Sequence, residues 1–128
     1  MLRVLVVDDY ADVAQTLAML ARLWGYNVWH ATSGPAALAL AAGWLPHVAV
    51  LDLAMPGMDG YELGARLRAL PGLARLRLVA QTGLSAGTLG PEALEALEAR
   101  FELLLLKPID PARWRDLLEV YACLEGSA

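Results

Sequence analysis

The segment LRVLVVDD (residues 2–9) carries an apolar run into two adjacent acids, and HVAVLD (residues 47–52) carries a second run into one acid. Both runs are continuous rather than alternating, which is typical of strands that are covered on both faces of a sheet. Two further runs end on polar residues: LVAQT (residues 78–82) and ELLLLK (residues 102–107). The apolar part of each of these four segments predicts a buried parallel strand, with polar side chains at or just after its end.

Strand-like and helix-like segments alternate along the whole chain. Five βα repeats of this size predict an α/β fold, with a parallel sheet between two layers of helices. Gly25 fits a helix C-terminal cap, Ser33 an N-cap, and Pro91 and Pro111 the first turn of a helix. The predicted strands cover residues 2–7, 26–30, 47–51, 76–80 and 102–106, and the predicted helices cover residues 13–24, 36–42, 61–70, 91–100 and 111–124.

Length and composition narrow the class of protein. A chain of 128 residues fits one domain spanning residues 1–128, and 58% hydrophobic against 19% charged residues excludes disorder. No apolar run approaches the roughly 18 residues that a membrane-spanning helix needs, so we expect no membrane insertion. The net charge is −4 and the ten Lys and Arg residues are scattered, so we expect no direct nucleic-acid binding.

The N-terminus and the cysteine content indicate where the protein acts. The first apolar stretch is too short, and too soon acidic, to be a secretory signal. Cys123 is the single cysteine, which excludes an intramolecular disulfide and a cysteine-based metal site. We expect a cytoplasmic protein, with Cys123 as a small buried residue of the last helix.

The polar residues at the predicted strand ends form one candidate site. Asp8 and Asp9 follow the first strand, Asp52 the third, Thr82 the fourth and Lys107 the fifth. Neighbouring strands lie about 4.8 Å apart, so these side chains can converge at one edge of the sheet. Three carboxylates in contact repel one another unless a cation neutralises them. Mg²⁺ is the expected cation, because it binds through carboxylates and phosphate oxygens.

That arrangement suggests phosphoryl transfer. The Asp52 carboxylate can act as a nucleophile that forms an acyl phosphate, whose charge the metal and Lys107 share. Thr82 offers a hydroxyl donor to a phosphoryl oxygen. The bond between Lys107 and Pro108 could be cis, which would aim the lysine across the site, and the sequence leaves the isomer open.

Each residue of this site also has an ordinary structural explanation. Asp8 and Asp9 could cap the first helix, and Asp59 could cap the third. Lys107 alone would more often be a surface lysine, and Thr82 a turn hydroxyl. The functional interpretation depends on all of them occurring together at one sheet edge.

Four segments together resemble the receiver domains of response regulators and of hybrid histidine kinases. The ending of the chain, KPID followed by PARWRDLL, is particularly similar to receivers of hybrid kinases. Together the order and spacing of the acid pair, the single Asp, the Thr and the Lys-Pro pair are specific, and they cover essentially the whole chain. The segments are VLVVDDYADVAQTLAMLARLWGYNV (residues 4–28), VLDLAMPGMDGYEL (residues 50–63), VAQTG (residues 79–83) and LLLLKPID (residues 103–110).

The resemblance implies a flavodoxin-like, doubly wound sheet of order 2-1-3-4-5 with five helices. It implies that Asp52 is the phosphoacceptor, that Thr82 is the switch hydroxyl and that Lys107 contacts the phosphoryl group. Mg²⁺ would be held by Asp8, Asp9, Asp52 and the backbone carbonyl of Ala54. The implied partners are a histidine kinase or a histidine phosphotransfer protein, and the face of the last two helices could support a homodimer.

Several positions depart from the family pattern. Leu104 stands three residues before the lysine, where receivers often carry an aromatic switch residue. Arg100 stands where the family often has Gly, and Phe101 beside it is expected to be core. Ala54 and Leu84 occupy the positions that tune phosphoryl lifetime, and neither can orient an attacking water, so we expect slow self-dephosphorylation.

Two other functions compete with a phosphorylation-controlled interaction module. An aspartate-based phosphohydrolase would use the same nucleophile, but it needs a second acid two residues later, where this chain has Ala54. A docking protein with a degenerate site is disfavoured because all five key side chains are present. We therefore expect no enzyme acting on other substrates, only catalysis of the chain's own phosphorylation and dephosphorylation.

Overall fold

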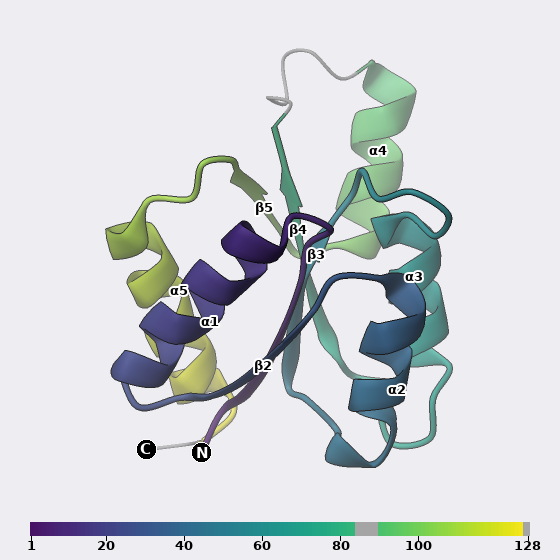
Figure 1. Cartoon of the computed structure of the whole chain (residues 1–128). Helices are drawn as coiled ribbons and strands as arrows, with labels where there is room; N and C mark the ends of the chain where they lie inside the picture. The colour runs from purple at the N-terminus through teal and green to yellow at the C-terminus, as the bar shows by residue number, and fades with distance from the viewer. Residues whose placement is uncertain (84–89, 127–128) are drawn as a thin grey trace.

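The computed structural model describes residues 1–83 and 90–126, in which strands and helices alternate as predicted (Figure 1). Each predicted element is present, and its ends differ from the prediction by a few residues. The elements are β1 (Arg3–Val7), α1 (Ala11–Leu23), β2 (Asn27–Ala31), α2 (Gly34–Trp44), β3 (Val48–Asp52), α3 (Gly60–Arg68), β4 (Arg77–Thr82), α4 (Pro91–Arg100), β5 (Leu103–Leu106) and α5 (Pro111–Leu124).

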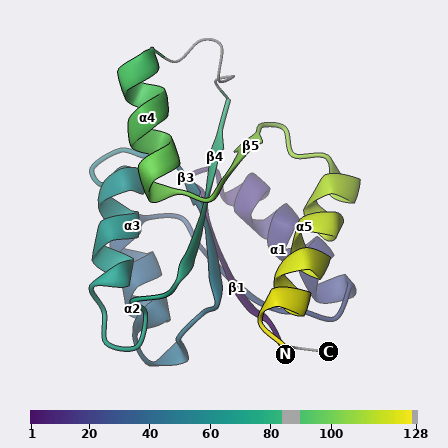
Figure 2. The same ribbon diagram turned by 180° about the vertical axis from the view of Figure 1, so that it is seen from behind.

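The strands form one parallel sheet in the order β2-β1-β3-β4-β5, which confirms the predicted order. Helices α1 and α5 cover one face, and α2, α3 and α4 cover the other (Figures 1 and 2). The register pairs Val7 with Leu51 and Asp52 with Gln81. The carboxyl ends of the central strands therefore meet at one edge.

Successive residues of the central strands enter two different hydrophobic cores. Val4 and Val6 pack with α1 and α5, whereas Leu5 and Val7 pack with α2, α3 and α4. All four of these side chains are 0% exposed. Both faces of these strands are buried, which explains why their apolar runs are continuous.

Strand β4 extends further than predicted. The prediction ended at Ala80, but the strand continues through Gln81 and Thr82. Both residues pair with neighbouring strands, Gln81 with Asp52 and Thr82 with Leu106. Polar side chains gave no strand signal, and the backbone pairing on both sides overrides that local preference.

The capping residues expected at Ser33, Asp59 and Gly25 are confirmed. The Ser33 hydroxyl accepts a hydrogen bond from the Ala36 backbone N–H at 3.2 Å, and the Asp59 carboxylate accepts one from the Glu62 N–H at 2.8 Å. Gly25 follows α1 with a φ of +96°, a conformation that favours glycine. Among the described helices, none is long and apolar enough to cross a membrane.

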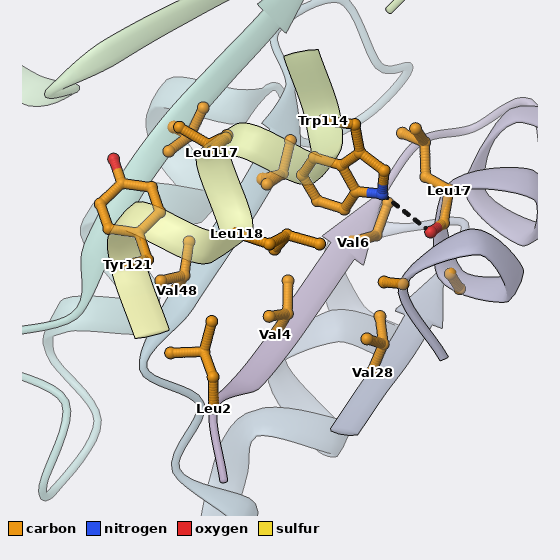
Figure 3. Close-up of a cluster of buried hydrophobic side chains, with 14 of the residues drawn as sticks. Leu2, Val4, Val6, Leu17, Val28, Val48, Trp114, Leu117, Leu118 and Tyr121 are labelled. Atoms are coloured by element: carbon orange, nitrogen blue, oxygen red, sulfur yellow. Dashed lines mark hydrogen bonds between the residues drawn. The ribbon is translucent and has the colours of Figure 1, made fainter. Parts of the chain in front are cut away.

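The two ends of α5 differ in burial. Trp114 is completely buried, and its indole N–H donates to the Leu17 carbonyl of α1 at 3.0 Å (Figure 3). Cys123 is exposed, which contradicts the expectation that it is buried. The buried face of α5 ends at Tyr121, and a residue two positions later points about 200° away from it around the helix.

The remaining tryptophans pack at or near the surface. Trp29 is 42% exposed and stacks on Trp44, with ring centroids 5.0 Å apart. Trp24 lies beneath the Arg115 guanidinium, 5.4 Å from ring centroid to carbon. These contacts pack Trp29 of β2 against the end of α2, and the end of α1 against α5.

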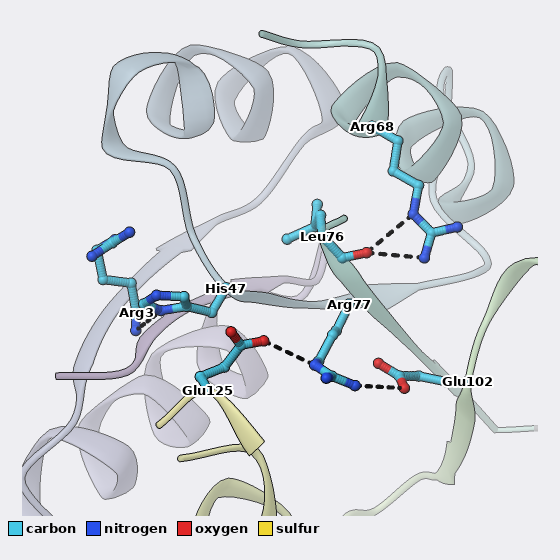
Figure 4. A network of polar contacts seen from close by, with 7 residues as sticks. All are labelled: Arg3, His47, Arg68, Leu76, Arg77, Glu102 and Glu125. Carbon is cyan, nitrogen blue, oxygen red and sulfur yellow. Dashed lines mark hydrogen bonds and ion pairs between the residues drawn. The ribbon is translucent and has the colours of Figure 1, made fainter. Parts of the chain in front are cut away.

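Ion pairs and hydrogen bonds hold the amino-terminal edge of the sheet (Figure 4). The Arg77 guanidinium lies 2.9 Å from the Glu125 carboxylate and 3.3 Å from that of Glu102. The Nδ1 of His47 accepts a hydrogen bond from the Arg3 backbone N–H at 2.9 Å. These charged pairs are partly exposed, so each contributes little to stability. They join the end of α5 to the edge opposite the candidate site.

Replacing Trp114 with Phe is expected to lower the free energy of unfolding by about 1–3 kcal/mol, because it removes a buried hydrogen bond and leaves a cavity. Urea unfolding monitored by circular dichroism measures the loss. Trp29→Phe is the matched control, expected to change stability by less than about 1 kcal/mol because the ring is half exposed. Equal losses in the two variants would contradict the role of the Trp114 contact.

Candidate functional site

The ends of four strands bring the predicted site residues together. Asp8 follows β1, Asp52 ends β3, Thr82 ends β4 and Lys107 follows β5. The Lys107 backbone N–H donates to the Thr82 carbonyl at 2.8 Å, which continues the β4–β5 pairing past the end of β5. The residues are far apart in sequence, and their proximity follows from the strand order.

Three carboxylates form a compact cluster at this edge. Asp8, Asp9 and Asp52 each offer an oxygen within 4.8 Å of the others. Asp8 is 0% and Asp52 3% exposed, whereas Asp9 is exposed. In the described part of the chain, this is the one group of three or more acidic, His or Cys residues that could hold a metal ion. Its oxygen donors suit a hard divalent cation.

Lys107 supplies the positive charge nearest to the cluster. Its Nζ lies 2.8 Å from Asp8 Oδ2 and 3.2 Å from Asp52 Oδ2. Burial lowers the pKa of the ammonium, but the hydrogen bond to Asp8 and the charge of Asp52 outweigh it and raise the pKa above its ordinary value. Lys107 is therefore charged at neutral pH and is not a free surface lysine. The Lys107–Pro108 peptide bond is cis.

Asp52 is the acid whose ionisation the site opposes. The pKa of its carboxyl is raised from 3.8 to about 6, mainly by burial and further by the hydrogen bond with Asp9 and the charge of Asp8. The hydrogen bond from the Ala54 backbone N–H, at 3.2 Å, and the charge of Lys107 act in the opposite direction. One lysine does not fully compensate three carboxylates, so a bound cation would be favoured.

The backbone around the acids is built from short local contacts. Asp8 Oδ1 accepts a hydrogen bond from the Tyr10 N–H at 2.9 Å. Tyr10 is the N-cap residue of α1 and has no side-chain cap, so neither Asp8 nor Asp9 caps that helix. A Cβ on Gly60 would lie 2.6 Å from the Asp52 carbonyl oxygen, so glycine allows α3 to start directly against the end of β3.

The positions that depart from the family pattern have ordinary surroundings. Leu104 is half-buried in the core beneath α3 and α4, and Phe101 is 5% exposed in the same core, as expected. Arg100 remains helical, with its guanidinium 5.8 Å from the centre of the Tyr61 ring, so the position has no left-handed strain. Leu84 lies outside the described residues.

Gln81 is a site neighbour for which sequence reasoning predicted no role. It is 0% exposed, and its side-chain amide donates to the Val7 carbonyl at 3.2 Å. A polar residue between Ala80 and Thr82, inside an otherwise apolar run, was the signal that could have identified it. Its contact on β1 was not predictable, since Val7 is 74 residues away.

Sheet order and helix layers define a doubly wound α/β domain, and the three acids clustered at its carboxyl edge could hold a cation. The chain belongs to the response regulator receiver domain family, whose model matches residues 4–119. It is 36% identical over 108 residues to the response regulator PleD of Caulobacter vibrioides, covering 84% of this chain. It is 40% identical over 114 residues to the virulence sensor protein BvgS of Bordetella pertussis, again covering 84% of this chain.

Those two relatives are much longer than this chain, which spans 23% of PleD and 9% of BvgS. A 14.6 kDa protein from the sodA1 3′ region of Leptolyngbya boryana is similar in length, at 37% identity over 94% of this chain and 89% of the relative. Among solved structures, the chemotaxis protein CheY4 of Vibrio cholerae superimposes with a TM-score of 0.84 at 27% identity, covering 94% of this chain and 98% of CheY4. These similarities agree with the observed strand order.

The raised pKa of Asp52 predicts that Asp52→Asn stabilises the metal-free protein at neutral pH. The native state holds the Asp52 proton more tightly than the unfolded chain, so stability falls as pH rises from about 4 to about 6. Asp52→Asn has no carboxyl to ionise at this position. Its free energy of unfolding should therefore exceed that of the wild type by roughly 1–3 kcal/mol above pH 7, since one pKa unit corresponds to about 1.4 kcal/mol. Below pH 4 the two proteins should be equally stable.

Urea unfolding in the presence of a chelator, repeated across this pH range, measures the difference. Asp59→Asn is the control, because Asn and Asp cap a helix equally well and the change in charge is the same. If the stability gained by Asp52→Asn did not vary with pH, the ionisation of Asp52 would not be its cause.

Proposed function

We propose that this chain is a phosphoacceptor module in which Asp52 accepts a phosphoryl group in a Mg²⁺-dependent reaction. The observation that carries the proposal is the position of the Asp52 carboxylate, buried at the carboxyl edge between two further acids and 3.2 Å from the Lys107 ammonium. Membership of the receiver family supports it. The phosphodonor would be a histidine kinase or a histidine phosphotransfer protein.

Each residue of the site would have a separate role in phosphoryl transfer. An Asp52 oxygen attacks phosphorus, the bond from phosphorus to the donor nitrogen breaks, and that nitrogen keeps the electron pair and takes up a proton. Mg²⁺, held by Asp8, Asp9, Asp52 and the Ala54 carbonyl, would neutralise charge on the phosphoryl oxygens. Lys107 provides a second positive charge, and the Thr82 hydroxyl would donate to a phosphoryl oxygen.

Self-modification fits this site better than turnover of another substrate. Hydrolysis of the acyl phosphate needs a group that orients water, and Ala54 has none. We therefore propose that the chain catalyses only its own phosphorylation and a slow dephosphorylation. Residues 1–128 would act as one receiver unit whose partner binding changes with phosphorylation.

A homodimer through the face of α4, β5 and α5 stays a prediction. Leu103 and Leu106 on β5 are 38% and 49% exposed, and Val120 on α5 is 55% exposed. An interface on this face would cover these apolar side chains. Sedimentation of the protein with and without beryllofluoride would detect it.

Asp52→Asn is expected to abolish phosphorylation by a small donor such as acetyl phosphate, because the amide cannot act as the nucleophile. Intact-protein mass spectrometry measures the product, and circular dichroism checks that the fold persists. Asp59→Asn should be phosphorylated at the wild-type rate. Phosphorylation of Asp52→Asn at that rate would show that the acceptor lies elsewhere.

Asp9→Ala is expected to weaken Mg²⁺ binding and to slow phosphorylation together, each by about tenfold or more, since it removes a metal ligand. Isothermal titration calorimetry measures the affinity. Asp12→Ala, in the first turn of α1, makes the same change in charge outside the acid cluster and should have little effect. Unchanged Mg²⁺ affinity in Asp9→Ala would exclude Asp9 as a ligand.

A further inference from the structure

Gln81 is buried where the fold has little use for a polar side chain. It is 0% exposed on β4, on the same face as Val79, and the surrounding core on that face is apolar. Beside it lies a groove of about 530 Å³ between α1 and the segment after β5, whose lining is mixed. The apolar residues are Val13, Leu17, Pro108 and Ile109, and the polar ones besides Gln81 are Asp12, Thr16 and Lys107.

The side-chain amide of Gln81 is only half satisfied. Its Nε2 donates to the Val7 carbonyl at 3.2 Å, whereas its Oε1 is buried with no hydrogen-bond partner among the described residues. A buried acceptor left unpaired costs more than a single neutral hydrogen bond contributes. The fold alone therefore does not explain a glutamine at this position.

The contacts of Gln81 lie next to three residues of the proposed site. Its side chain binds the carbonyl of Val7, the residue before Asp8. Its own carbonyl accepts from the N–H of Leu53, the residue after Asp52, at 3.1 Å. The next residue in the chain is Thr82. Gln81 thus joins β1 to β4 across the intervening β3, directly beneath the acid cluster.

We infer that Gln81 is a positioning residue for the site, an inference that rests on the proposed function. The backbone pairing of β1 with β2 and β3 brings Asp8 to this edge, and the Gln81 amide adds a side-chain tie at Val7. This tie restricts the end of β1, so that the Asp8 carboxylate stays within reach of Lys107 and of a cation shared with Asp52. The three carboxylates repel one another, and a β1 end without this tie would let Asp8 move away from the others. The glutamine is retained for site geometry at some cost in stability.

Gln81→Met is the principal test, because methionine keeps the length and the unbranched shape but cannot donate to Val7. We expect Mg²⁺ affinity, measured by calorimetry, to fall by about tenfold, and the rate of phosphorylation by acetyl phosphate to fall similarly. The urea midpoint should be equal to or higher than that of the wild type. Gln81→Asn keeps the amide but is one methylene shorter, and it should show the same loss of affinity.

Val79→Ala is the matched control on the same face of β4. It creates a cavity and should lower the urea midpoint while leaving the Mg²⁺ affinity of the folded protein unchanged. A residue with a purely structural role would behave in the same way. The inference is supported if Gln81→Met loses Mg²⁺ affinity but not stability, and Val79→Ala loses stability but not Mg²⁺ affinity.

Three outcomes would overturn the inference. They are wild-type Mg²⁺ affinity in Gln81→Met, wild-type affinity in Gln81→Asn, and failure of both Gln81→Met and Gln81→Leu to fold. Failure of the proposed function is distinguishable, because it would appear as a wild-type protein that is not phosphorylated on Asp52. The comparison of Mg²⁺ affinities would then still decide the role of Gln81.

Discussion

The parallel pairing of β1 with β3 is the constraint on which the rest of the structure depends. Its register sets Val7 beside Leu51, so that Asp8 and Asp52 leave the sheet at the same edge. Both strands are covered by helices on both faces, which removes their ends from most of the solvent. The hydrophobic effect that assembles the sheet thereby forces together carboxylates that repel one another.

That conflict links stability to chemistry. The apolar surroundings and neighbouring acids raise the pKa of Asp52 to about 6, and Lys107 offsets only part of the cost. A protein selected for stability alone would have uncharged side chains in place of such a cluster of acids. Gln81 fits the same picture, because its half-paired amide is a cost that the core does not require. Both unfavourable features, the clustered acids and the half-paired amide, lie at the carboxyl edge of the sheet, where the candidate site is.

The two edges of the sheet are built in different ways. At the amino-terminal edge, Arg77 pairs with Glu102 and Glu125, so opposite charges compensate one another (Figure 4). At the carboxyl edge, like charges accumulate around one lysine. The compensated edge ties the end of α5 to the sheet, and the uncompensated negative charge at the other edge favours a cation.

The sequence by itself determined the alternation of elements and the residues that follow the strand ends, because continuous apolar runs and terminal acids are local signals. The sheet order came only from the resemblance to a known family, since apolar periodicity does not say which strands are neighbours. The sequence could not place Gln81 and Thr82 within β4, since backbone pairing with β3 and β5 decides where that strand ends. It also placed Cys123 in the core, whereas the buried face of α5 ends at Tyr121. Only the tertiary structure showed Gln81 in contact with Val7, because hydrogen bonds between residues distant in sequence leave no periodic pattern.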